Sequence, residues 1–168
     1  MSSNSPDVLD QVQLRRIEAV HRGFLYQHLY AVACLLRLNL IGATFLIVES
    51  DEDIELQFSD KRIYVQVKTR AQQLDEADIS DALSKFEKLR KEHNTGARSG
   101  SASFIIVSNV APGPKLRERT RATGWPADVQ LSRRASHLPT NRCRTLGGTF
   151  RKLLTNAREL RRSCHLRY

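Results

Sequence analysis

Short apolar runs early in the chain have the length and spacing of β-strands. Residues 43–49 (ATFLIVE) form one such run. Residues 53–58 (DIELQF) and 63–70 (IYVQVKTR) alternate between apolar and polar positions, so every second side chain is expected to face the same side of a sheet. Residues 59–62 (SDKR) are predicted to form the turn between them. The pattern therefore predicts three consecutive strands joined as a meander.

Helices are predicted on both sides of these strands. Helical spacing begins near residue 9, and Gly23 is expected to punctuate this first helix. Between residues 24 and 38 apolar residues occur on nearly every face, which is typical of a buried helix. Residues 75–93 form an amphipathic helix, and residues 104–107 (FIIV) form a buried strand after a Gly/Ser-rich loop.

The resulting order, α-β-β-β-α-β, predicts an α/β fold with a mixed central sheet flanked by helices. Residues 1–8 are expected to be a disordered N-terminus and residues 9–114 to form the core. After residue 114 the periodicity fades and no convincing strand is expected. Residues 115–168 are interpreted as a basic C-terminal arm, in which residues 149–166 have the pattern of a basic amphipathic helix.

Charge is distributed unevenly along the 168 residues. Residues 1–114 contain 13 Lys and Arg against 15 Asp and Glu, a balance of −2, whereas residues 115–168 contain 14 against 3, a balance of +11. The whole excess behind the net charge of +9 therefore lies in the last third. Three interpretations of this arm stay open: a phosphate-binding segment, a solvated or disordered tail, and the product of a truncated gene.

Several classes of protein are excluded. The three cysteines are an odd number without metal-ligand spacing, which excludes a disulfide framework and a zinc finger. The polar N-terminus does not resemble a signal peptide. The longest uncharged run of the first apolar segment, residues 23–36, is too short to span a bilayer. The expectation is a cytoplasmic protein without membrane association.

Chemistry is expected where the polar faces of two predicted strands meet. Asp53 and Glu55 share one face of their strand, and Gln66 and Lys68 share one face of the next. If the strands pair through the turn at residues 59–62, a carboxylate, an amide oxygen and an ammonium converge. Phosphodiester hydrolysis uses these groups, because a carboxylate holds Mg²⁺, which activates water, and a lysine positions that water or stabilises developing charge.

Asp53 followed by Gln66-Val67-Lys68 resembles the D…QxK variant of the PD-(D/E)XK nuclease superfamily, whose core has the same element order. Three segments in sequence, RGFLYQ (22–27), VESDEDIEL (48–56) and YVQVKTR (64–70), look like the endonuclease domain of CD-NTase-associated effector proteins in bacterial anti-phage defence. They are also similar to Mrr-type restriction nucleases. The resemblance covers residues 22–109, about half of the chain.

The resemblance implies roles for the residues of the D…QxK motif. Asp53 would be the primary ligand of Mg²⁺, with Mn²⁺ as a substitute. Gln66 would stand at the second acidic position and offer its side-chain carbonyl oxygen, and Lys68 would be the catalytic lysine.

Other residues would support this site. Gln27 occupies the place where Mrr-like relatives often have a glutamate, so two positions that can be acidic in the superfamily both hold glutamine. Metal affinity would then depend on Asp53 with help from Glu49 or Glu55, whereas the neighbouring Asp51 and Glu52 are interpreted as loop charge.

The implied partner is double-stranded DNA. Effectors of this kind usually continue into a nucleotide-sensing domain, which is not expected within residues 115–168, and a homo-oligomer is also expected. The candidate phosphate contacts are Arg22, Arg70, Arg151, Lys152 and Arg158.

Two further hypotheses compete with a metal-dependent DNA endonuclease of phage defence or restriction. The first is a non-catalytic nucleic-acid-binding module on a degenerate nuclease fold, and the second is a fragment whose activity needs a missing sensor domain. Each candidate residue also has a structural interpretation, in which Asp53, Glu55 and Lys68 are solvated strand residues and Gln27 is satisfied by the backbone.

Overall fold

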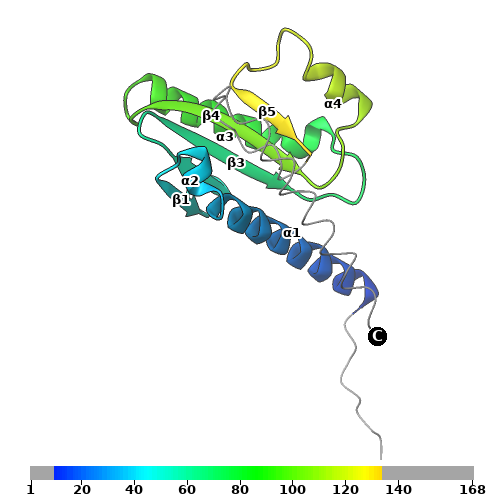
Figure 1. The fold of residues 1–168 in the computed structure, drawn as a ribbon. Helices are drawn as coiled ribbons and strands as arrows, with labels where there is room; N and C mark the ends of the chain where they lie inside the picture. Colours follow the sequence, from blue (N-terminus) through cyan, green and yellow to red (C-terminus); the bar gives the residue numbers. More distant parts are fainter. Residues whose placement is uncertain (1–9, 134–168) are drawn as a thin grey trace, which may run out of the picture. The chain divides into compact units, whose positions relative to one another are not determined.

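Five strands form one mixed sheet in the order β1-β2-β3-β4-β5 (Figure 1). The computed structural model describes residues 10–133. The strands are β1 (Phe45–Val48), β2 (Ile54–Gln57), β3 (Lys61–Lys68), β4 (Ser101–Ser108) and β5 (Val129–Ser132). The helices are α1 (Gln11–Leu35), α2 (Leu38–Ile41), α3 (Glu76–Asn94) and α4 (Pro114–Arg119).

The pairing of the strands confirms the predicted fold class. β1, β2 and β3 form an antiparallel meander, whereas β3 and β4 are parallel. Because parallel neighbours cannot be joined by a tight turn, α3 provides the crossover between them. The predicted order α-β-β-β-α-β is present, with α2, α4 and β5 added to it.

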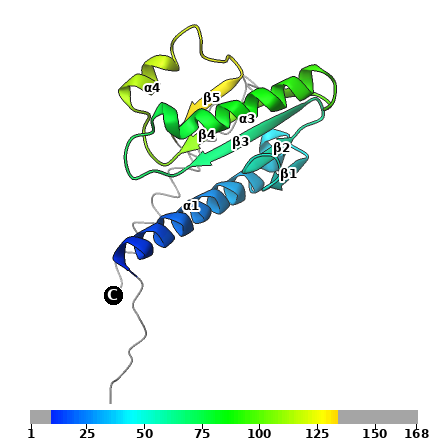
Figure 2. The same cartoon turned by 180° about the vertical axis from the view of Figure 1, so that it is seen from behind.

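Alternation along β2 and β3 divides their side chains between two apolar clusters. Ile54 of β2 and Val65 of β3 pack in the cluster beneath α1. Tyr64 of β3 faces the cluster beneath α3, where Phe86 stacks on Phe104 with ring centroids 4.7 Å apart. Figures 1 and 2 show α1 and α3 on opposite faces of the sheet, so the sheet is the middle of three layers.

Helix α1 differs from the prediction, because only one side of it is buried. Gln27, Tyr30, Ala31 and Cys34 form its buried stripe. The expected all-round burial between residues 24 and 38 is wrong, since the larger apolar side chains on the other faces of α1 are exposed, among them Leu25, Leu29, Val32 and Leu35. An apolar pattern on every face does not show which faces meet the sheet. Within the described residues, no helix has the length and apolar character needed to cross a membrane.

Gly23 does not punctuate α1, which continues through it as one helix. Glycine weakens a helix interior by only about 1 kcal/mol, so surrounding packing overrides it. A Cβ atom at this position would lie 3.2 Å from the Thr69 Oγ1 atom, next to the end of β3. Gly23 therefore lets α1 approach the strand that carries Gln66 and Lys68.

Two elements beyond residue 113 were not predicted. Helix α4 begins at Pro114, and β5 pairs in parallel with β4 through Val129 and Phe104. The expectation of no strand after residue 114 is therefore wrong: four residues (VQLS) are too few for a periodic signal, and pairing with β4 determines their conformation. The sheet thus continues past the expected boundary at residue 114. The expectations for residues 1–8 and 149–166 lie outside the described residues.

An ion-pair network holds the loop between β1 and β2. In this loop, residues 49–53, the Glu49 N–H donates to the Asp53 carbonyl oxygen at 3.1 Å. Arg98, between α3 and β4, donates to the Asp51 carboxylate at 2.5 Å and to the Glu92 carboxylate at 2.6 Å. The hydrogen bond from Arg98 keeps the pKa of Asp51 below its usual value. The network connects the loop to the far end of α3.

Replacement of Arg98 tests this connection. We expect Arg98→Ala to raise the hydrogen-exchange rate of the Glu49 amide roughly tenfold, because hydrogen bonds between charged groups contribute about 1.5–3 kcal/mol and partial exposure reduces that. The matched control is Arg90→Ala, which removes ion pairs with Asp128 and Glu87 instead. Equal exchange of the Glu49 amide in wild type and Arg98→Ala would show that the network does not hold the loop.

Candidate functional site

Asp53 is hydrogen-bonded to β3, the strand that carries Gln66 and Lys68. It directly precedes β2, and its Oδ2 atom accepts hydrogen bonds from Gln66 Nε2 at 2.5 Å and from the Val67 N–H at 2.6 Å. The β2–β3 ladder ends at the pair Ile54 and Val65, so the Asp53 side chain takes the place of a further backbone partner for Val67. The predicted convergence of Asp53 and Gln66 is thus present in the structure.

Competing effects act on the Asp53 carboxyl. Its burial raises its pKa above the ordinary value. The hydrogen bonds from Val67 and Gln66 and the charges of Lys68 and Lys85 favour the ionised form, and burial outweighs them. No hydrogen bond to Asp53 Oδ1 is present within the described part of the chain, so this oxygen can meet a cation.

Glu52 is a second buried carboxylate beside Asp53. Its side chain is only 4% exposed, and neither carboxylate oxygen has a hydrogen-bond partner among the described residues. Burial raises the pKa of Glu52 to about 7, and the neighbouring Asp53 charge adds to this, whereas Lys85 and Lys68 oppose it. A buried polar group without a partner is rare and calls for an explanation.

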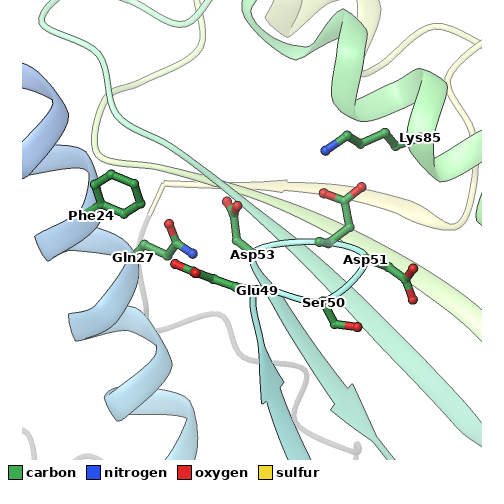
Figure 3. Close-up of a pocket in the computed structure, with 8 residues that line it drawn as sticks. Phe24, Gln27, Glu49, Ser50, Asp51, Asp53 and Lys85 are labelled. Carbon is green, nitrogen blue, oxygen red and sulfur yellow. The ribbon is translucent and has the colours of Figure 1, made fainter.

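These carboxylates line an open pocket of about 270 Å³ (Figure 3). In Figure 3, Gln27 from α1 and Glu49 from the β1–β2 loop point toward one another beside Asp53, and Lys85 extends from α3 toward them. A second pocket of about 210 Å³ shares Phe24, Gln27 and Asp53 and adds Gln66 to the lining. Three elements and one loop therefore contribute polar groups to one region.

The predicted Glu49 and Lys68 lie at the margins of this region. Glu49 is exposed, lines the larger pocket and has a φ of 56°, a left-handed conformation that non-glycine residues seldom adopt. Lys68 ends β3 and lines neither pocket. Its positive charge opposes the rise that burial causes in the pKa values of Glu52 and Asp53.

Glu55 lies apart from the pocket residues. It is 2% exposed, and its Oε1 atom accepts hydrogen bonds from Gln57 Nε2 at 2.8 Å and from Arg62 at 3.1 Å. It lines neither pocket. These bonds partner the buried charge of Glu55 within the sheet.

The candidate phosphate contacts fall into three groups. Arg22 is exposed on α1 beside Gly23, which lines the smaller pocket. Arg70 follows β3, but its guanidinium is bound to the Asp78 carboxylate at 2.6 Å. The positions of Arg151, Lys152 and Arg158 lie outside the described residues.

Two residues that the sequence pattern did not single out also line the larger pocket: Glu52 and Lys85. The sequence predicts that Glu52 is a charged loop residue, because strand alternation begins only at Asp53 and does not indicate where the side chain before it points. Lys85 lies on the polar side of an amphipathic helix, next to the buried Phe86. Nothing in the sequence showed which lysine of α3 faces the β1–β2 loop.

The donor set suits a hard divalent cation. Carboxylates of Asp53, Glu52 and Glu49 and an amide of Gln27 line one pocket, and Mg²⁺ prefers such oxygen ligands. Between residues 10 and 133, no group of three or more His, Cys, Asp or Glu side chains is close enough to enclose a metal ion. Mg²⁺ needs only one or two carboxylates, because waters and substrate phosphates complete its shell.

Residues 18–119, more than half of the chain, match the family model described as Cap4, dsDNA endonuclease domain. No curated protein and no solved structure gives a match. The matched segment begins within α1, ends with α4 and includes Gln27, Asp53, Gln66 and Lys68. The chain therefore belongs to the Cap4 dsDNA endonuclease domain family, a nuclease of anti-phage effectors.

Proposed function

We propose that this nuclease domain hydrolyses phosphodiester bonds of double-stranded DNA at the pocket beside Asp53, with Mg²⁺ as its cofactor and Mn²⁺ as a substitute. The observation that carries the proposal is the pair of hydrogen bonds from Gln66 Nε2 and the Val67 N–H to Asp53 Oδ2. They fix one carboxylate beside the end of β3, so little reorganisation is needed when a cation and a phosphate arrive.

Asp53 and Glu49 are the carboxylates proposed to hold the cation. Gln66 Nε2 donates to Asp53, which leaves the Gln66 carbonyl oxygen as a further ligand at the opposite side of the amide. When bound, a divalent cation polarises a phosphoryl oxygen and lowers the pKa of an attacking water. Gln27, 9% exposed and lining both pockets, would orient that water through its amide.

Lys68 supplies the positive charge at the end of β3. Its ammonium, whose charge opposes the rise in the pKa values of Asp53 and Glu52, would orient the attacking water or stabilise negative charge on the phosphate. A neutral side chain at residue 68 would do neither.

Exposed basic groups would hold the DNA backbone. Arg22 is the proposed phosphate contact within the described residues, since it is exposed beside the smaller pocket. Arg70 would reach a phosphate only by releasing Asp78. The roles of Arg151, Lys152 and Arg158 stay predictions. The same holds for a cytoplasmic location, a homo-oligomer and a separate nucleotide-sensing domain.

Substitutions at residues 53 and 68 test the catalytic assignment. We expect Asp53→Asn and Lys68→Ala to reduce cleavage of double-stranded plasmid DNA in Mg²⁺ by about 100-fold or more, because each removes a charge from the reaction centre. Asp81→Asn and Lys91→Ala are the controls, since both residues are exposed on α3, and they should retain wild-type rates.

Cleavage at the wild-type rate by Asp53→Asn and Lys68→Ala would refute the assignment. A wild-type protein that binds DNA in a salt-sensitive manner, without cleavage in Mg²⁺ or Mn²⁺, would instead favour the non-catalytic module.

The cofactor is tested by removal and return of the metal. Wild-type protein treated with EDTA should lose cleavage of double-stranded DNA, because an activated water and a neutralised phosphate both depend on the cation. Added MgCl₂ or MnCl₂ should restore it, whereas NaCl at matched ionic strength should not. Full cleavage in EDTA would contradict a metal-dependent mechanism.

A further inference from the structure

Glu52 is held inward although its place in the chain would let it face solvent. It belongs to the β1–β2 loop, in which Glu49, Ser50 and Asp51 are all exposed. Its own side chain is 4% exposed, and both carboxylate oxygens are buried without a hydrogen-bond partner in the described residues. A buried carboxylate without a hydrogen bond or an ion pair is strongly unfavourable, so some other group is expected to compensate it.

Glu55, the other buried glutamate of this hairpin, has polar partners that offset the cost of burying its charge. Glu55 accepts hydrogen bonds from Gln57 and from the charged Arg62. Glu52 has no equivalent, because no lysine or arginine among the described residues lies within ion-pair distance of it. Of the two buried glutamates in this hairpin, therefore, the one that lacks an ion pair is the one that lines the pocket.

The surroundings of Glu52 indicate which ligand it would take. It lines the larger pocket together with Asp53 and Glu49, and the charge of Asp53 acts on it directly. A carboxylate in this position would repel another anion and would attract a cation. Lys85 lines the same pocket and its charge acts on Glu52, but the two side chains form no ion pair.

We propose that Glu52 is a further ligand of the divalent cation, shared with Asp53. The proposal rests on the proposed metal-dependent function and extends it by naming a further carboxylate beside Asp53. Glu52 would thereby add a negative charge to a site in which residues 27 and 66 are neutral glutamines. The unpartnered oxygens of Glu52 are those that the cation would satisfy.

Thermal unfolding separates this role from a structural one. In EDTA, Glu52→Gln should unfold at a higher temperature than wild type, because an amide replaces a buried unpaired charge. In MgCl₂, wild type should gain thermal stability and Glu52→Gln should gain little. Titration with MgCl₂ and with MnCl₂ by calorimetry should show an affinity at least about tenfold lower for Glu52→Gln. Glu118→Gln, an exposed change on α4, should match wild type in every measurement.

The outcomes distinguish this proposal from the proposed function. Equal Mg²⁺ and Mn²⁺ affinity and an equal gain in unfolding temperature for wild type and Glu52→Gln would overturn the role of Glu52 and leave metal-dependent cleavage standing. Cleavage by wild type in EDTA would overturn the metal dependence itself. Should Glu52→Gln not fold, Glu52→Ala removes the carboxylate altogether, and wild-type Mg²⁺ affinity in it would also overturn the proposal.

Discussion

The structure of this site depends on how the Asp53 carboxylate is held against β3. The β2–β3 ladder stops one residue after Asp53, and Oδ2 of Asp53 receives the Val67 N–H and the Gln66 amide that would otherwise lack partners on that side. Asp53 Oδ2 thus completes the hydrogen bonding at the end of β3, whereas Oδ1 accepts no hydrogen bond from the described residues. The Asp53 side chain therefore both completes the hydrogen bonding of β3 and lines the pocket.

The rest of the site follows from keeping that loop in place. Arg98 binds Asp51 from the far end of α3, and Gly23 allows α1 to approach the end of β3. In this arrangement α1, the loop and α3 line one pocket, and Glu52 is buried there without a hydrogen-bond partner among the described residues. The fold therefore buries a carboxyl group without a hydrogen-bond partner where a cation and a DNA phosphate would meet, a cost to stability that cation binding would offset.

Local pattern predicted the meander, α3 and β4, because alternation and helical spacing arise within each segment. It predicted that Asp53 and Gln66 would converge, since strand pairing through a short turn follows from alternation. It failed for β5, whose conformation is imposed by β4, and for α1, where an apolar surface on every side does not reveal which side meets the sheet. It also missed Glu52 and Lys85, because loop direction and helix rotation are set by tertiary contacts such as Arg98 with Asp51.

The most direct test is a crystal structure of the protein soaked with Mn²⁺, with the ion located from its anomalous scattering. We expect a peak about 2.1 Å from Asp53 Oδ1, since Mn²⁺ replaces Mg²⁺ at similar distances, while Oδ2 keeps its hydrogen bonds to Gln66 and Val67. A Mn²⁺ ion bound elsewhere, with none in contact with Asp53, would contradict it.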